Sequence, residues 1–417
     1  MKKYFIFAGI LFFALFVNAQ NPLEELAFYQ KQAQNPTKQI QQEVIKNLQS
    51  WIEENRDLPE ASKALILKAN SEKSLKAYPD FVITLLRYKY EFGVSNNIQS
   101  SLKESAKEFA KNEQEAYNKL INIKASQSAL PERLDTFLTL ATKANLKGTY
   151  QPLIKEYEMF FKRFRDYEEI DRMELMLGDL HRANKNPYGA LMQYEKVWTV
   201  YPDTKYKAAS LRMQGDVYAS DLKDYEKAKA IYAQVLNDYP TSLERPTAYY
   251  HLALMEEGQK QYEDALNHLD FAAKLYQEQD DKDSLYEVLL FKAEIQEKNL
   301  KDYEGTAKTL NKAAGLFINK EKKFEEVQFK LADLYRSKLK DIVLQRKAYE
   351  DFIKAYPNAK QAEKALFEAA TLAKNAKDYQ VARGYFEKII VNNPSSPYAN
   401  KAQRQINSID KQLAQNK

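Results

Sequence analysis

A pattern that recurs about every 38 residues constrains the fold of this chain more than any other feature. Its clearest copies place a small residue four positions before an aromatic ring and twelve positions before a proline: Ala190, Tyr194 and Pro202; Ala228, Tyr232 and Pro240; Ala382, Phe386 and Pro394. Weaker copies begin at Leu153, Ala265, Thr306 and Gln345, so successive copies lie 37, 38, 37, 41, 39 and 37 residues apart. Such a period is typical of stacked repeats, in which each unit buries its apolar face against the next.

A second small residue lies 12 or 13 positions before six of these anchors: Gly178, Gly215, Ala253, Ala293, Ala332 and Ala370. Small residues on two facing helices let their backbones approach closely, while a large ring one turn later fills the space beside them. Each repeat is therefore predicted to be a pair of helices.

Prolines separate the repeats. Proline disfavours helical conformation in the residue before it, so we expect each second helix to end near Tyr201-Pro202, Tyr239-Pro240, Tyr356-Pro357 or Asn393-Pro394. The short polar residue after each proline is expected to cap the next helix. The turn inside the pair also recurs, as Leu-Lys-Asp at residues 222–224, 300–302 and 339–341.

These features resemble the tetratricopeptide repeat (TPR), a helix–turn–helix unit with a small residue in each helix and a closing proline. The resemblance covers roughly residues 130–396, with a longer period than the usual 34 residues. It implies a right-handed superhelix whose first helices line a concave face that binds a protein or peptide. The lengthened Tyr-Pro connection is similar to that of bacterial envelope repeat proteins acting in β-barrel assembly and with the Tol-Pal system.

The predicted fold is all-α: an α-solenoid of TPR-like helix–turn–helix repeats with a degenerate helical region before it and a capping helix after it. The segments are a signal peptide (1–19), the degenerate helical region (20–129), the repeat array (130–396) and the capping helix with its tail (397–417). Within the degenerate region, the Gln-rich residues 20–42 are expected to be loose or peripheral, and residues 100–124 to form one amphipathic helix.

The N-terminus predicts export. Lys2 and Lys3 precede an apolar run from Tyr4 to Val17, and Ala19 ends a small-residue cleavage pattern. We expect a periplasmic or secreted protein without a membrane span after cleavage. The chain has no Cys, which excludes a lipid-bearing cysteine, disulfides and thiolate metal sites. Lys and Arg number 63 and Asp and Glu 58, evenly distributed, so no nucleic-acid partner is expected.

The sequence contains no recognisable catalytic motif. His181, His251 and His268 form no metal-binding pair, and no glycine-rich phosphate motif or nucleophile motif occurs. We therefore predict no catalytic residues, no metal and no cofactor, and interpret the protein as a non-enzyme.

Function is instead expected on the first helices. The repeat register places one set of side chains on the groove face: Leu175, Arg212, Tyr250, Leu290, Phe329, Arg336 and Phe367. These are candidate partner-binding residues, and the alternative is that several of them pack between neighbouring repeats. The leading hypothesis is an exported non-enzymatic TPR scaffold for protein–protein interactions in the bacterial cell envelope. The alternative is a soluble periplasmic protein that handles a ligand or glycan, and a helical hydrolase comes third.

Overall fold

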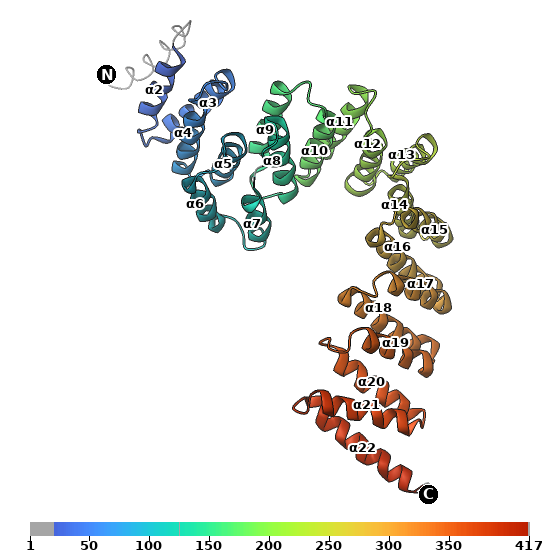
Figure 1. Ribbon diagram of the computed structural model, residues 1–417. Coiled ribbons are helices and arrows are strands. Elements are labelled where there is room, and N and C mark those ends of the chain that lie inside the picture. Colours follow the sequence, from blue (N-terminus) through green and yellow to red (C-terminus); the bar gives the residue numbers. More distant parts are fainter. Residues whose placement is uncertain (1–20, 125, 416–417) are drawn as a thin grey trace, which may run out of the picture. The chain divides into compact units, whose positions relative to one another are not determined.

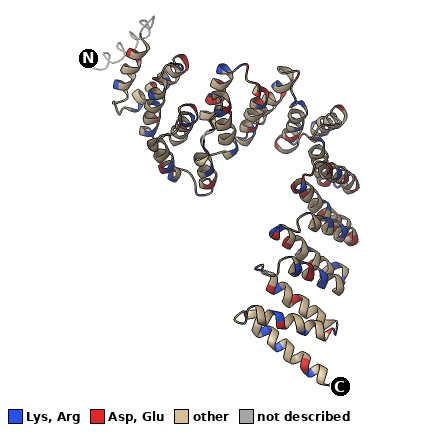
Figure 2. Cartoon of the chain, viewed as in Figure 1, with Lys and Arg blue, Asp and Glu red and all other residues tan. Residues whose placement is uncertain are grey.

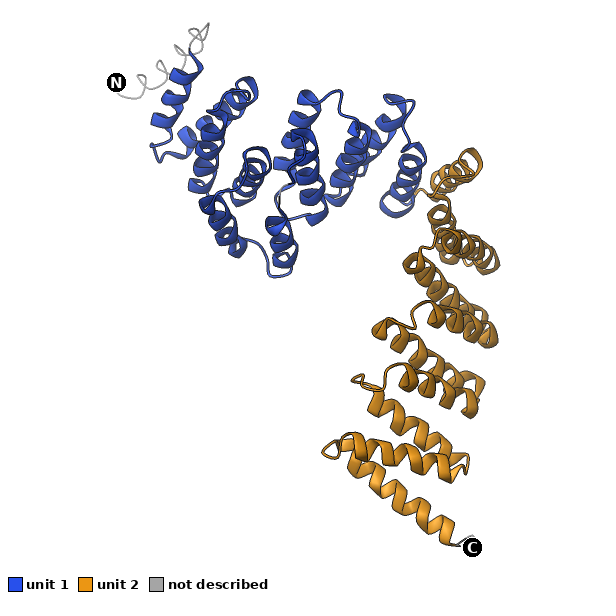
Figure 3. Ribbon diagram, viewed as in Figure 1, with its two compact units in different colours: residues 1–223 blue, residues 224–417 orange. Residues whose placement is uncertain are grey.

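In the computed structural model, the chain is helical throughout the part that is described, residues 21–124 and 126–415, where no strand occurs (Figure 1). It divides into two compact units, residues 1–223 and 224–417 (Figure 3). The predicted signal peptide lies outside the described residues. Among the helices that are described, none combines the length and apolarity needed to cross a membrane. The predicted all-α fold is confirmed, while the segment boundary at 129/130 stays a prediction.

Unit 1 begins with the helices that are hardest to predict from the sequence. They are α2 (Pro22–Gln32), α3 (Lys38–Glu54), α4 (Ala61–Ser74), α5 (Tyr78–Phe92), α6 (Asn96–Ser105), the short 3-10 helix η2 (Ala106–Glu108) and α7 (Gln114–Asn122). Of the two alternatives for residues 20–42, loose or peripheral, the first is wrong for the described part, because Leu26 of α2 is buried and the indole of Trp51 donates to the carbonyl of Pro22. The single helix expected at 100–124 is also wrong. The backbone becomes extended at Phe109, whose ring stacks on Tyr117 at 4.8 Å.

The repeat pairs follow in both units. Unit 1 continues with α8 (Leu130–Ala144) and α9 (Tyr150–Arg163), α10 (Ile170–Ala183) and α11 (Pro187–Thr199), and α12 (Lys207–Asp216) with its π-helical end η3 (Val217–Leu222). Unit 2 contains α13 (Tyr225–Asp238), α14 (Arg245–Gly258), α15 (Tyr262–Glu278), α16 (Lys282–Glu294) with η4 (Ile295–Leu300), α17 (Tyr303–Leu316), α18 (Glu321–Leu334) with η5 (Tyr335–Leu339), α19 (Ile342–Ala355), α20 (Ala362–Asn375), α21 (Tyr379–Asn392) and α22 (Pro397–Gln415).

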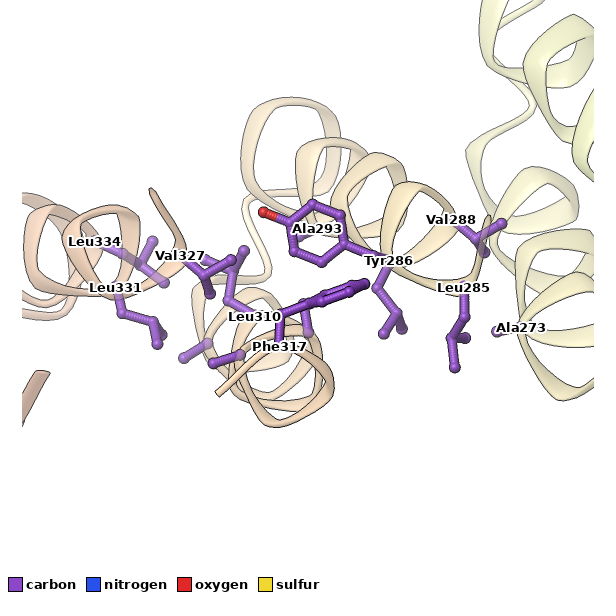
Figure 4. Packing of buried hydrophobic residues seen from close by; sticks show 14 of the residues in the cluster. Ala273, Leu285, Tyr286, Val288, Ala293, Leu310, Phe317, Val327, Leu331 and Leu334 are labelled. Carbon is purple, nitrogen blue, oxygen red and sulfur yellow. The ribbon is translucent and has the colours of Figure 1, made fainter. Parts of the chain in front are cut away.

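The small residues lie where the register places them. A Cβ atom built on Gly178 of α10 would be 2.3 Å from Cε1 of Tyr194 in α11, so this ring occupies the space that the glycine leaves. Tyr194 and its neighbour Ala190 are fully buried, and the Tyr194 hydroxyl donates to Asp179 at 2.7 Å. In unit 2 buried side chains of α16, α17 and α18 pack in one cluster, where Tyr286 meets Phe317 edge-on with the ring centroids 5.2 Å apart (Figure 4).

The prolines end the second helices as expected. α13 ends at Asp238, α19 at Ala355 and α21 at Asn392, each two residues before a proline. The expected caps after the prolines are wrong, because the next helices begin several residues later and their N-cap residues Tyr206, Glu244 and Gln361 make no side-chain cap.

The turn inside the pair carries the cap instead. In the recurrent Leu-Lys-Asp turns, Asp224, Asp302 and Asp341 each accept a hydrogen bond from the backbone N–H three residues later, at 2.8–3.2 Å. The preceding residues Lys223, Lys301 and Lys340 adopt left-handed backbone conformations, with φ of 55–59°. This conformation ends a first helix whose last turn has widened to π geometry in η3, η4 and η5.

Replacing Gly178 with Ala should destabilise unit 1. The added methyl group would collide with the buried Tyr194 ring, and overpacking of this kind costs on the order of 1–3 kcal/mol in the free energy of unfolding. Gly384→Ala is the matched control, because a Cβ at Gly384, inside α21, meets nothing within 4 Å. That variant should be stabilised by roughly 0.5–1 kcal/mol. Denaturant unfolding measures both, and a neutral Gly178→Ala would contradict the packing.

Replacing Lys340 with Gly should stabilise the chain by about 1 kcal/mol, because a side chain in the left-handed region is strained and glycine is not. The same substitution at the exposed Lys308, inside α17, should instead cost about 1 kcal/mol. Opposite signs in thermal or denaturant unfolding are expected. Two destabilised variants would show that the Lys340 side chain contributes more than its backbone strain costs.

Candidate functional site

The predicted groove positions all lie on first helices or their π-helical ends. In unit 1, Leu175 of α10 is 4% exposed and belongs to the apolar core around Tyr194. Arg212 of α12 is partly buried and forms an ion pair with Asp216 on the same helix. Leu175 is therefore a packing residue in this structure, and Arg212 keeps a partly exposed guanidinium.

In unit 2, two of the predicted residues share one pocket. Tyr250 of α14 and Leu290 of α16 line a half-open pocket of about 410 Å³, to which α17, η4 and Lys330 of α18 also contribute. We call it the first-helix pocket, because three successive first helices contribute to it. Its volume lies within the range of sites that accommodate a small ligand or a single anchoring side chain.

The floor of the first-helix pocket is apolar. Leu290, Phe291 and Leu310 form it, and the rings of Tyr250 and Phe291 meet edge-on with their centroids 5.9 Å apart. Tyr250 is half-buried, and burial followed by the negative charge of Glu287 raises the pKa of its hydroxyl. The tyrosine therefore stays neutral and offers an O–H group at the edge of an apolar surface.

The rim of the pocket is charged and predominantly acidic. Glu287, Glu294 and Glu297 line it together with Lys298 and Lys330. Both lysines are engaged in exposed pairs within a helix turn, Lys298 with Glu294 at 2.5 Å and Lys330 with Glu326 at 2.8 Å. Among the described residues no ion pair involves Glu287 or Glu297, so two carboxylates at the rim are available to a cationic partner.

The remaining predicted positions lie outside this pocket. Phe329 of α18 packs edge-on against Tyr349 and Phe352, with both centroid distances 5.5 Å. The ring of Phe367 in α20 packs against the rings of Phe386 and Tyr398, with both centroid distances 5.5 Å. Arg336 in η5 is exposed and pairs with Asp333. The structure thus brings together Tyr250 and Leu290, while both phenylalanines lie partly buried between helices.

The sequence reasoning missed Phe291 and Glu287. The signal was present, because positions 287, 290, 291, 294 and 298 follow the three- and four-residue spacing of one helix face. Extending the register by one helical turn on either side of Leu290 would have found the rim.

The three histidines have structural partners. Tyr150 shares a hydrogen bond of 2.8 Å with His181, Tyr232 one of 3.1 Å with His251, and Glu256 one of 2.6 Å with His268. Within residues 21–124 and 126–415 no group of three or more His, Asp or Glu side chains is arranged to hold a metal ion. Lys, Arg, Asp and Glu intermingle on the helices of each unit (Figure 2).

Consecutive helix pairs with a ring opposite a small residue define an α-solenoid of two-helix repeats. Two family models match the chain: that of the tetratricopeptide repeat over residues 209–242, and that of the YfiO family, described as an outer membrane lipoprotein, over residues 283–417. Together with the packed helix pairs, these two matches support a tetratricopeptide-repeat protein. Among curated proteins none matches it.

Solved structures with similar folds are distant in sequence. A TPR protein from Cytophaga hutchinsonii is 15% identical, with 64% of this chain and 98% of that chain covered and a TM-score of 0.40. The pilF protein of Pseudomonas aeruginosa is 19% identical, with 57% and 98% covered and a TM-score of 0.35. A Rap protein in complex with competence and sporulation factor is 14% identical, with 95% and 99% covered and a TM-score of 0.37. No TM-score here reaches 0.5, so the assignment depends on the family models and the repeat geometry.

Proposed function

We propose that this protein is an exported, non-enzymatic scaffold of the bacterial cell envelope that holds protein partners on the first helices of its repeats. In this proposal the first-helix pocket of unit 2 receives an apolar side chain from a partner segment whose flanking residues are basic. The single observation that carries it is the placement of Tyr250 and Leu290, predicted from the repeat register, at one acid-rimmed pocket.

The location in the envelope has two independent supports. Residues 1–19 have the basic start, apolar run and small-residue end of a signal peptide. The outer membrane lipoprotein family model covers residues 283–417, the same part of the chain that contains most of the pocket lining. The 417 residues include no Cys, the residue that carries the lipid in lipoproteins, so we propose a periplasmic or secreted protein rather than a lipid-anchored one.

The geometry of the first-helix pocket favours binding of a partner's apolar side chain over catalysis. Buried apolar side chains at the centre of an interface contribute most of its free energy, and a ring of polar groups around them excludes water. Leu290, Phe291 and Leu310 supply such a centre, and the carboxylates of Glu287 and Glu297 lie at the rim. Charges in this position chiefly raise the rate of encounter with an oppositely charged partner.

The experiment isolates a partner by crosslinking in the envelope fraction and then measures its affinity with purified components. Tyr250→Ala and Leu290→Ala should each weaken binding by about 30-fold, the effect of losing roughly 2 kcal/mol at an anchor. Glu287→Gln combined with Glu297→Gln should slow association and flatten its dependence on salt.

Phe271→Ala is the matched control. Phe271 is an aromatic residue of the second helix α15, is 53% exposed and does not line the pocket. Its loss should leave the affinity unchanged within about twofold, and all variants should keep the helical circular-dichroism signal. Equal affinity for all variants would contradict the proposed site, and recovery of the partner only from the cytoplasm would contradict the proposed location.

A further inference from the structure

A second pocket lies in unit 1, apart from the first helices on which the proposed function rests. Helices α3, α4, α5 and α9 line a half-open pocket of about 370 Å³. The α3 side is formed by successive positions of one helix face, Gln42, Ile45, Lys46, Gln49 and Ser50. Its size is at the small end of the range for small-molecule sites. We call it the N-terminal pocket.

The inner wall of the N-terminal pocket contains charged side chains that are almost fully buried. Lys68 is 8% exposed, Glu72 2%, Thr84 2% and Glu156 3%. The Lys68 ammonium donates to the Thr84 hydroxyl at 2.8 Å and pairs with Oε1 of Glu72 at 2.8 Å. Burying several ionised groups in one place costs free energy unless each is paired and hydrogen-bonded, so a wall of this kind is rarely incidental.

The hydrogen-bonding capacity of this wall is only partly used. Oε2 of Glu72 and Oε2 of Glu156 are both buried without a hydrogen-bond partner among the described residues. The Glu156 oxygen lies 3.6 Å from Nη1 of Arg87, which is an ion pair but too long for a hydrogen bond. Burial raises the pKa of Glu72 more than its neighbours Lys68 and Thr84 lower it. A donor group that reached the two carboxylates would complete the wall and relieve this cost.

The more exposed part of the lining carries two lysines, and the partly buried Asp80 also lines the pocket. Lys46 of α3 and Lys155 of α9 line it and are exposed, and neither forms an ion pair with a described residue. Glu72 and Glu156, which pair with Lys68 and Arg87, thus each keep one carboxylate oxygen without a hydrogen bond. The exposed lysines of the lining have ammonium groups without an ion pair. Opposite charges at the two ends of a small cavity are complementary to a ligand that carries both signs.

We propose that the N-terminal pocket binds a small zwitterion, a free amino acid or dipeptide, with its ammonium group at Glu72 and Glu156 and its carboxylate at Lys46 and Lys155. The two carboxylates accept charge-assisted hydrogen bonds from the ammonium, and the lysines hold the other end in solvent-accessible positions. Ile45, Ile83 and Pro152 provide apolar surface along the length of the cavity. This site is independent of the partner surface in unit 2.

Isothermal titration calorimetry of the full chain against free amino acids and small dipeptides tests this proposal. At least one of them should bind with measurable heat. Its N-acetylated form should bind at least tenfold more weakly, because a charge-assisted hydrogen bond to a buried carboxylate is lost. Its methyl ester, which lacks the carboxylate charge, should also bind more weakly. The double variant Lys46→Ala and Lys155→Ala should weaken binding of the free acid by about the same factor.

Variants of the wall add a second line of test. Glu156→Gln and Glu72→Gln should each reduce affinity by about tenfold or more. Glu43→Gln, an exposed residue of α3 that does not line the pocket, should leave it unchanged. The acetylated ligand keeps the test decisive where a wall variant fails to fold.

Three outcomes would overturn the proposal. If no amino acid or dipeptide binds, the pocket holds water only, and equal binding of the N-acetylated ligand would exclude a role for the ammonium group. Equal binding of a simple amine such as ethylamine would show that the carboxylate of the ligand plays no part. Because none of these measurements involves the protein partner, failure here leaves the proposed scaffold function standing.

Discussion

The ring that a second helix places against the small residue of its first helix sets the distance between the two helices, and the repeat packing depends on that distance. Gly178 and Tyr194 show it most directly, since the ring occupies the volume in which any other residue would place its Cβ. Ala370, Ala382 and Phe386, all fully buried, repeat the arrangement in unit 2. With this spacing fixed, the outer face of each first helix remains free to carry side chains that packing does not determine.

The repeat register could be predicted because packing selects residue size at fixed spacing, and size is visible in the sequence. The turn geometry could not. The Leu-Lys-Asp turns recur, but a lysine does not predict a left-handed backbone conformation, because glycine and asparagine are the residues that usually adopt it. The N-terminal helices were misjudged for a related reason. The Gln-rich composition of residues 20–42 favours a loose or peripheral segment, whereas one buried leucine and one tryptophan hydrogen bond hold α2 in place.

The candidate site was predictable only in part. The register placed Tyr250 and Leu290 correctly on first helices, but it could not separate them from Phe329 and Phe367, which occupy equivalent positions and lie between packed rings. That difference arises from neighbouring side chains that vary between repeats. The N-terminal pocket was beyond sequence reasoning altogether, because its wall combines single residues from helices far apart in the chain.

The two pockets also differ in what their charges contribute. Lys298 and Glu294 at the first-helix pocket form an exposed pair that is screened by solvent, and such charges act mainly on encounter and selectivity. Lys68 and Glu72 in the N-terminal pocket are almost fully buried, so their arrangement is costly unless it is completed. One surface is therefore suited to a partner chain, and the other to a small charged ligand.

The central claim is that the first-helix pocket binds a partner chain. Its most direct test is site-specific photocrosslinking in intact cells, with a photoreactive residue at position 287 on the pocket rim or at position 343, an exposed position of the second helix α19. The account predicts a discrete crosslinked partner from position 287 and none from position 343; the reverse pattern would contradict it.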